Sequence, residues 1–136
     1  MITVLFACVH NAGRSQMAAA FFNAIADPAR ARAISAGTEP GARVHPVVVE
    51  AMREVVIDLS AAVPRKLTPE LASQAQILVT LGCGEACPVV PGARVIDWPV
   101  PDPKDQAIES VRELRSDIEK RVRELIAVER LGPIGR

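Results

Sequence analysis

The sequence predicts a single α/β domain in which a parallel four-stranded sheet carries helices on both faces. Apolar runs of strand length alternate with helical patterns along the chain, which is typical of right-handed strand–helix–strand units. The first run, Ile2 to Ala7, is apolar almost throughout, as expected of a strand that is buried on both sides. The 136 residues are enough for one hydrophobic core, so we expect one domain over residues 1–136.

Four strands are expected from short apolar runs. They cover residues 2–7, 32–35, 76–80 and 94–96, and Gly37 closes the second of them. The carboxyl ends of parallel strands share one edge of a sheet, and α/β proteins bind their ligands at that edge. The residues that follow each strand therefore indicate where a functional site lies.

Helices are expected between these strands and after the last one. They cover residues 15–26, 46–55, a segment that begins near 69, and 108–126. Pro28 ends the first helix, Pro46 opens the second at its first position, and Thr68 caps the start of the third. The last helix has the clearest pattern, with apolar residues three and four apart, and we expect Gly132 and the proline after it to end it.

The composition excludes several classes of protein. Sixteen basic and sixteen acidic residues cancel, so nothing predicts a nucleic-acid surface, and the low aromatic content of 3% argues against base stacking. No apolar run reaches membrane length, and the first strand lacks the basic flank of a signal peptide, so we expect a cytoplasmic protein without a membrane contact. Three cysteines do not make a disulfide scaffold and instead indicate thiol chemistry in a reducing compartment.

The stretch from Cys8 to Ser15 is the candidate site. A thiol at the end of a buried strand is followed, six residues later, by Arg14. The backbone between them must curl, and we expect Gly13 to ease the curl through a positive φ angle. A curled backbone directs successive N–H groups inward and forms an anion-binding nest, to which the next helix adds the positive end of its dipole.

This loop should activate Cys8 as a nucleophile. The positive field favours its thiolate, and the hydroxyl of Ser15 is placed to donate a hydrogen bond to the sulfur. Arg14 supplies a planar fork that suits a tetrahedral oxyanion. The residues expected to bind that oxyanion are Val9, His10, Asn11, Ala12, Gly13, Arg14 and Ser15. The alternative is that Cys8 is a buried cysteine with a structural role only.

Two further thiols, Cys83 and Cys87, follow the third strand and so lie at the same edge of the sheet. A purely structural pair is one alternative. A zinc site is another, but the number of residues between the thiols is three rather than two, and neither histidine is near in sequence, so we expect no metal.

Asp102 lies in a proline-rich segment after the fourth strand. Such segments are stiff, so Asp102 is a candidate general acid aimed at the loop, or else a capping residue with no chemistry. We expect His10 to point away from the loop, His45 to cap a helix, and Trp98 to pack in the core rather than to recognise a ligand.

With these residues identified, the chain resembles the arsenate reductases that share the low-molecular-weight tyrosine phosphatase fold. The resemblance covers nearly the whole chain. It is carried by residues 8–18, Ser35-Ala36-Gly37, Val44-His45-Pro46, Cys83 with Cys87, and Asp102-Pro103. Asn11 and the Gln16-Met17-Ala18 run look like the reductase branch, and the resemblance implies that Asn11 braces the loop. A potassium-binding carboxylate of several reductases is matched here by Ala19.

The resemblance implies a reaction sequence. Cys8 attacks arsenate, Asp102 protonates the departing hydroxide, and Cys83 and then Cys87 carry the oxidation away as disulfides. Thioredoxin is the expected reductant, and family members that use a small thiol with a glutaredoxin-type protein leave a second route open. We expect a monomer that needs no cofactor.

Two other functions use the same loop. A phosphate monoesterase of the tyrosine phosphatase type would use Cys8, Arg14 and Asp102 but would need no second thiol. Its branch usually has tyrosine after Asp-Pro, where this chain has Lys104 and no tyrosine at all. A non-enzymatic regulator that binds an oxyanion or arsenite would not need Asp102.

Overall fold

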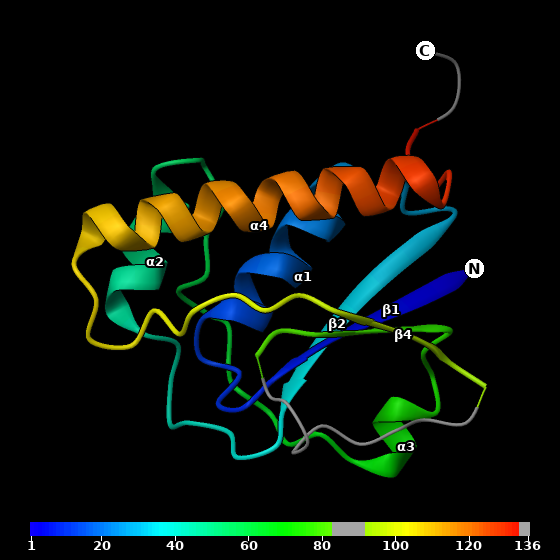
Figure 1. Cartoon of the computed structure of the whole chain (residues 1–136), viewed down its shortest axis with the longest axis horizontal. Coiled ribbons are helices and arrows are strands. Elements are labelled where there is room, and N and C mark those ends of the chain that lie inside the picture. Colours follow the sequence, from blue (N-terminus) through cyan, green and yellow to red (C-terminus); the bar gives the residue numbers. More distant parts are fainter. Residues whose placement is uncertain (83–91, 134–136) are drawn as a thin grey trace.

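A computed structural model describes residues 1–82 and 92–133 (Figure 1). Its strands are β1 (Ile2–Cys8), β2 (Ala31–Gly37), β3 (Ile77–Thr80) and β4 (Arg94–Asp97), and its helices are α1 (Arg14–Ile25), α2 (Pro46–Arg53), α3 (Pro69–Ala72) and α4 (Ile108–Val128). The strands form one parallel sheet in the order β2-β1-β3-β4. The predicted α/β class and its four-stranded parallel sheet are therefore confirmed.

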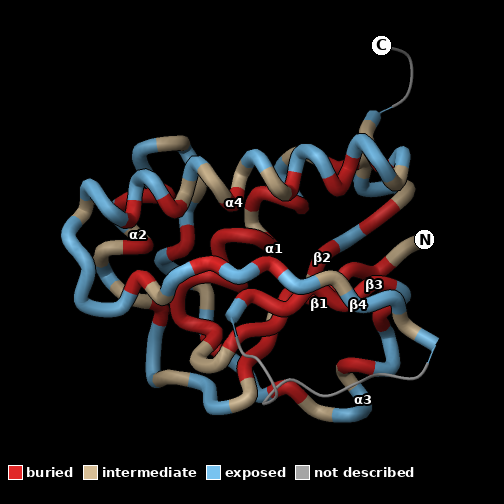
Figure 2. Tube along the Cα trace, in the orientation of Figure 1, coloured by how far each residue is buried: buried red, intermediate tan, exposed pale blue. Residues whose placement is uncertain are grey.

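The two faces of the sheet carry separate apolar cores because β1 alternates its side chains between them. Val4 and Phe6 belong to the larger core, which includes residues of α1, α2 and α4. Leu5 and Ala7 belong to the smaller core, to which the short α3 contributes. Figures 1 and 2 show α4 lying along α1 on one side, α3 on the other, and the buried strands between them.

The side chains of the core explain two further features. Trp98 is 7% exposed, and its ring lies 5.8 Å from that of Phe6, so it packs in the core as predicted. Its hydrophobic contact fixes the chain just before the segment that carries Asp102. Among the described residues, no helix combines the length and the apolar character needed to cross a bilayer.

The helix ends agree with the sequence in one case and correct it in another. Thr68 caps α3 as predicted, since its Oγ1 accepts a hydrogen bond from Leu71 N at 3.1 Å. Gly132, however, does not end α4. Arg130 adopts the left-handed conformation at φ 56°, and Leu131 N then bonds to Ile126 O at 2.9 Å. This is the hydrogen-bonding pattern that usually uses glycine, so local propensity did not identify the residue that ends the helix.

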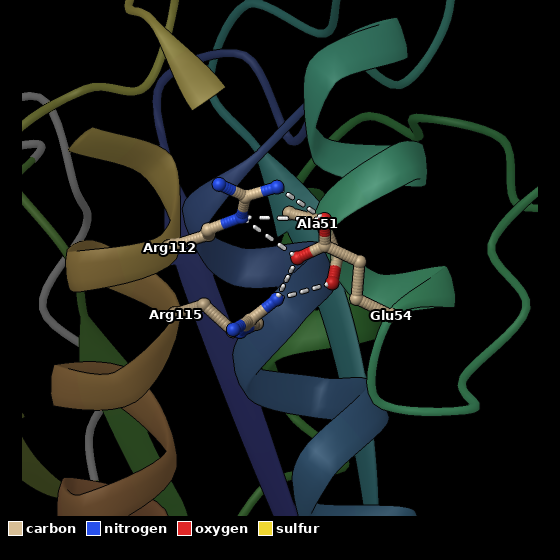
Figure 3. Close-up of polar contacts among 4 residues, drawn as sticks. All are labelled: Ala51, Glu54, Arg112 and Arg115. Carbon is tan, nitrogen blue, oxygen red and sulfur yellow. Dashed lines mark hydrogen bonds and ion pairs between the residues drawn. The ribbon is translucent and has the colours of Figure 1, made fainter. Parts of the chain in front are cut away.

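A carboxylate clamp joins α2 to α4 (Figure 3). Glu54, just after α2, accepts hydrogen bonds from Arg112 at 2.7 and 3.0 Å and from Arg115 at 2.7 Å. Arg115 also donates to Ala51 O at 2.7 Å. Because both guanidinium groups favour the charged form, the pKa of Glu54 falls from 4.5 to about 2.

This clamp predicts a pH-dependent contribution to stability. Because the pKa of Glu54 is depressed in the folded state, its contribution is complete above about pH 4.5 and disappears as the pH falls toward about 2. Urea unfolding at a series of pH values should therefore give a higher free energy of unfolding for the wild type than for Glu54→Gln above about pH 4.5. The two free energies should converge as the pH falls toward about 2. Glu113→Gln, at an exposed position of α4, is the control. A difference that stays constant through the window would contradict the role assigned to the clamp.

Candidate functional site

The candidate site lies at the carboxyl edge of the sheet, between β1 and α1. Cys8 is the last residue of β1 and Arg14 is the first of α1, so both ends of the loop are fixed by regular structure. The thiol is buried at 1% exposure. Asn11 is buried completely and adopts a left-handed conformation with φ 51°. The loop is therefore a tightly packed element and not an exposed connection.

The sulfur of Cys8 has two polar contacts inside the loop. Its Sγ lies 2.8 Å from Ser15 Oγ, which is the contact expected from the sequence. The amide N–H of Asn11 donates to the same sulfur at 3.3 Å. The Asn11 N–H is thus a donor directed at the sulfur, while either atom of the Ser15 contact can be the donor.

The backbone of the loop turns its carbonyl groups outward. Four of these carbonyls accept hydrogen bonds of 2.8–3.2 Å from the segment that follows β2. The pairs are Cys8 O with Thr38 N, Val9 O with Glu39 N, His10 O with Gly41 N, and Ala12 O with His45 N. Because C=O and N–H point in opposite directions across a peptide bond, the next N–H in each case points inward. Asn11 N, which reaches the sulfur, is one of these groups, and inward N–H groups of this kind are what the anion nest expected here requires.

Gly13 has a different role from the one expected. Its φ is −150°, so the positive φ angle in the loop belongs to Asn11. A Cβ on Gly13 would lie 2.5 Å from Cγ of Pro103 and 3.2 Å from its Cδ. Glycine is therefore needed because the segment after β4 packs directly on the loop. This contact brings Asp102, the neighbour of Pro103, to the site.

Arg14 and Asp102 come together as the sequence predicted. The guanidinium Nη2 lies 3.6 Å from Asp102 Oδ2, and Nη1 donates to Val100 O at 3.5 Å. The Arg14 side chain is 7% exposed and that of Asp102 is 39% exposed, so the carboxylate is open to solvent while the arginine is held in place. The other carboxylate oxygen accepts a hydrogen bond from Lys104 N at 3.0 Å, as in a local turn. Asp102 thus lies beside Arg14 and closes a local turn, and it does not cap α4, whose capping position is Ala107.

Two further glycines, Gly37 and Gly82, lie against groups of the candidate site, and the sequence did not predict these contacts. Gly82 has φ 79°, and a Cβ there would lie 2.4 Å from Arg14 Nη1. A Cβ on Gly37 would lie 2.5 Å from Val9 O and 2.9 Å from Asn11 N. Each glycine therefore leaves room for a group of the candidate site. No local sequence signal identifies these roles, because each depends on a partner far along the chain.

The two histidines lie beside the loop. His10 directs its Nδ1 to Glu39 O at 3.0 Å, consistent with the expectation that its ring points away. His45 occupies the capping position of α2, but its side chain makes no capping hydrogen bond, which corrects the predicted role. Its ring lies next to Gly13 and is partly buried, and burial lowers the pKa of His45 below 6.5, with the charge of Asp102 opposing that effect.

The two later thiols of the predicted site cannot be placed in the same way. Cys83 and Cys87 lie outside the described residues. The chain up to that point is described: Leu81 N donates to Ala7 O at 2.8 Å, and Gly82 lies against Arg14. The residue that precedes Cys83 is therefore in contact with the candidate site.

Known proteins are similar in sequence to this chain over nearly its whole length. A model of the family described as low molecular weight phosphotyrosine protein phosphatase matches residues 3–132. A protein of Halobacterium salinarum with a provisional name as an arsenate reductase is 40% identical over 128 residues, covering 88% of this chain and 87% of its own. A glutaredoxin arsenate reductase of Synechocystis sp. is 34% identical over 130 residues, covering 93% of this chain and 98% of its own.

The fold also matches solved structures. A thioredoxin-dependent arsenate reductase of Corynebacterium glutamicum superposes with a TM-score of 0.82 at 36% sequence identity. The match covers 96% of this chain but 63% of the Corynebacterium chain, which is therefore longer than the part shared with this protein.

Proposed function

This chain belongs to the low molecular weight phosphotyrosine protein phosphatase family, and from that membership and the site around Cys8 we propose that it is an arsenate reductase. One observation carries the proposal. A buried thiol receives a hydrogen bond from the Asn11 amide inside a loop whose outward carbonyls leave N–H groups facing inward, with Arg14 beside it. Such a site can bind a tetrahedral oxyanion and attack its central atom. The arsenate reductases among the relatives support arsenate as that oxyanion.

The first step forms a bond between Cys8 sulfur and arsenic. The loop amides and the guanidinium of Arg14 bind the arsenate oxygens and stabilise the charge that develops on them. A hydroxyl group of the bound arsenate leaves arsenic as the sulfur–arsenic bond forms, and Asp102 in its protonated form gives this hydroxide a proton so that it departs as water. The exposed carboxylate of Asp102, 3.6 Å from Arg14, supports this role because it can exchange protons with solvent.

The second step transfers two electrons to arsenic. The Cys83 thiolate attacks the Cys8 sulfur, the sulfur–arsenic bond breaks, and its electron pair leaves with arsenic as arsenite. Cys87 then attacks Cys83, releasing the Cys8 thiolate and leaving a Cys83–Cys87 disulfide. An external dithiol must reduce that disulfide before the next turnover.

We propose thioredoxin as this reductant and the cytoplasm as the place of action, where the reaction would serve arsenic resistance. The Corynebacterium relative is thioredoxin-dependent, which supports that choice. The Synechocystis relative is a glutaredoxin arsenate reductase, so glutaredoxin is the alternative to be tested beside it.

The experiment that tests the proposal compares two reactions of one protein preparation. Arsenite formation is measured with thioredoxin, thioredoxin reductase and NADPH, and p-nitrophenyl phosphate hydrolysis is measured in parallel. We expect sustained arsenite formation at a higher rate than the hydrolysis of p-nitrophenyl phosphate. Ester hydrolysis with no arsenite formed would identify a phosphatase, and oxyanion binding without either reaction would identify a regulator.

Replacing Cys83 should separate these reactions within one variant. Cys83→Ser should stop repeated arsenate reduction with thioredoxin, because Cys83 is the thiol proposed to attack the Cys8 sulfur and break the sulfur–arsenic bond. It should leave the weak ester hydrolysis unchanged, because that reaction uses Cys8, Arg14 and Asp102 only. Repeated arsenate reduction by Cys83→Ser with thioredoxin alone would show that the proposed order of thiols is wrong.

A further inference from the structure

Gln16 has buried hydrogen bonds that the proposed reaction does not use. It lies in the first turn of α1 and is 8% exposed. Its side-chain Nε2 faces three oxygen atoms: Asn11 O at 3.1 Å, Asn11 Oδ1 at 3.1 Å and Val63 O at 3.5 Å. A side-chain amide placed among acceptors in this way fixes the orientation of the groups it contacts.

The orientation of the Asn11 side-chain amide follows from the two N–H groups that donate to it. Oδ1 accepts from Gln16 Nε2 and also from the backbone N–H of Arg65, at 3.0 Å. Two donors at this position require an oxygen there, so Nδ2 must point the other way. Nδ2 then donates to Ser15 Oγ at 2.7 Å.

The direction of the Ser15 hydroxyl follows in turn. Its oxygen accepts the hydrogen bond from Asn11, and it has one hydrogen of its own to donate. Within the described part of the chain, the other hydrogen-bonding neighbour of Ser15 Oγ is Cys8 Sγ, at 2.8 Å. Ser15 is thereby made the donor and the sulfur the acceptor.

We propose that Gln16 is a positioning residue that sets this direction and so holds Cys8 in its thiolate form. The inference rests on the proposed role of Cys8 as nucleophile and extends it by naming the residue that polarises the contact. The hydrogen bonds of Gln16 go to Asn11 and Val63 and not to the sulfur, so Gln16 acts through Asn11 and Ser15.

The decisive variant is Gln16→Glu, which is similar in size but presents oxygen to three oxygens. The repulsion favours a flipped Asn11 side chain, whose oxygen would then draw the Ser15 hydrogen away from the sulfur. A negative charge in the first turn of a helix is itself favourable, so the variant does not weaken α1. Gln16→Met is the milder variant, because it removes both donors without adding an acceptor.

The measurement is the rate of Cys8 alkylation by iodoacetamide as a function of pH. The protein used for this measurement is the full chain with the substitutions Cys83→Ser and Cys87→Ser, so that Cys8 is its one remaining cysteine. A hydrogen bond to a charged group is worth enough to move the midpoint of the pH profile by about one unit. Gln16→Glu should raise the midpoint by about that much, and Gln16→Met should raise it by less.

Three comparisons distinguish positioning from a loosened structure. Ser15→Ala should raise the midpoint as Gln16→Glu does, and the double variant should equal Ser15→Ala, because both act through one hydrogen bond. Asn23→Ala is the matched control: Asn23 also ties α1 to its surroundings, through two hydrogen bonds to Ala33, and its loss should lower the melting temperature without moving the midpoint. Gln16→Glu adds a carboxylate to the charged and titratable groups around the loop, which are Arg14, Asp102, His10 and His45, whereas Gln16→Met leaves this set unchanged.

The outcomes separate this inference from the proposed function. An unmoved midpoint in Gln16→Glu, or in Gln16→Met if the first variant does not fold, would overturn the inference even in a protein that reduces arsenate. Additive shifts in the double variant, or an equal shift in Asn23→Ala, would also overturn it. A shifted midpoint in Gln16→Glu, together with no arsenate reduction by the wild-type chain, would uphold the inference and refute the proposed function.

Discussion

Replacing Cys8 by serine should abolish arsenate reduction, with a loss of about 10,000-fold or more. The contacts from Asn11 N at 3.3 Å and from Ser15 Oγ at 2.8 Å favour an anion on sulfur. A serine hydroxyl is far less acidic and stays protonated in the same place, so it offers no comparable nucleophile. The measurement is arsenite formation by Cys8→Ser with the complete thioredoxin system.

The same variant should keep its affinity for oxyanions. The inward N–H groups of the loop and the Arg14 guanidinium do not depend on the sulfur. Calorimetry with phosphate should therefore give binding close to that of the wild type, which also serves as the control for folding. Arsenite formation near the wild-type rate would remove Cys8 from the reaction. Loss of phosphate binding together with activity would show that the loop had collapsed, and the variant would then not test the chemistry.

Replacing Arg14 by lysine should lower arsenate turnover by about 100- to 1,000-fold. Arg14 uses one nitrogen for Val100 O and presents another toward Asp102, which is possible only for a planar fork. Lysine keeps the positive charge but has a single nitrogen. It therefore cannot keep the Val100 contact and bind two arsenate oxygens at once. The loss should appear in kcat and in phosphate affinity together.

Calorimetry with phosphate is the measurement that isolates this effect. Weaker phosphate binding in Arg14→Lys than in the wild type is the expected result. Arg53→Lys, an exposed substitution at the end of α2, is the matched control and should change neither binding nor turnover. Unchanged phosphate affinity in Arg14→Lys would remove this arginine from the oxyanion site.

The parts of the fold that depend on local pattern could be predicted from the sequence. The apolar run of β1 and the spacing from Cys8 to Arg14 are encoded within a few residues, as is the Thr68 cap. Asp102 was predicted through topology, because parallel strands end at one edge of the sheet. The described structure brings it to 3.6 Å from Arg14.

The parts that depend on distant partners could not be predicted. Gly13 is needed because Pro103, far along the chain, packs on it, and not because of its own φ angle. The left-handed residue of the loop is Asn11, whose conformation is held by contacts with Gln16 and Arg65. Arg130 ends α4 where a glycine two residues later was expected, and its carbonyl accepts a hydrogen bond from Arg30, far away in the sequence.

A single-turnover reaction tests whether this chain reduces arsenate with its own thiols. The fully reduced protein is mixed with arsenate in the absence of any external reductant, and arsenite and protein thiols are counted. We expect one arsenite for each protein molecule and the loss of two thiols, recovered by mass spectrometry as one disulfide. No arsenite from a protein that binds phosphate and hydrolyses p-nitrophenyl phosphate would contradict the proposed reduction.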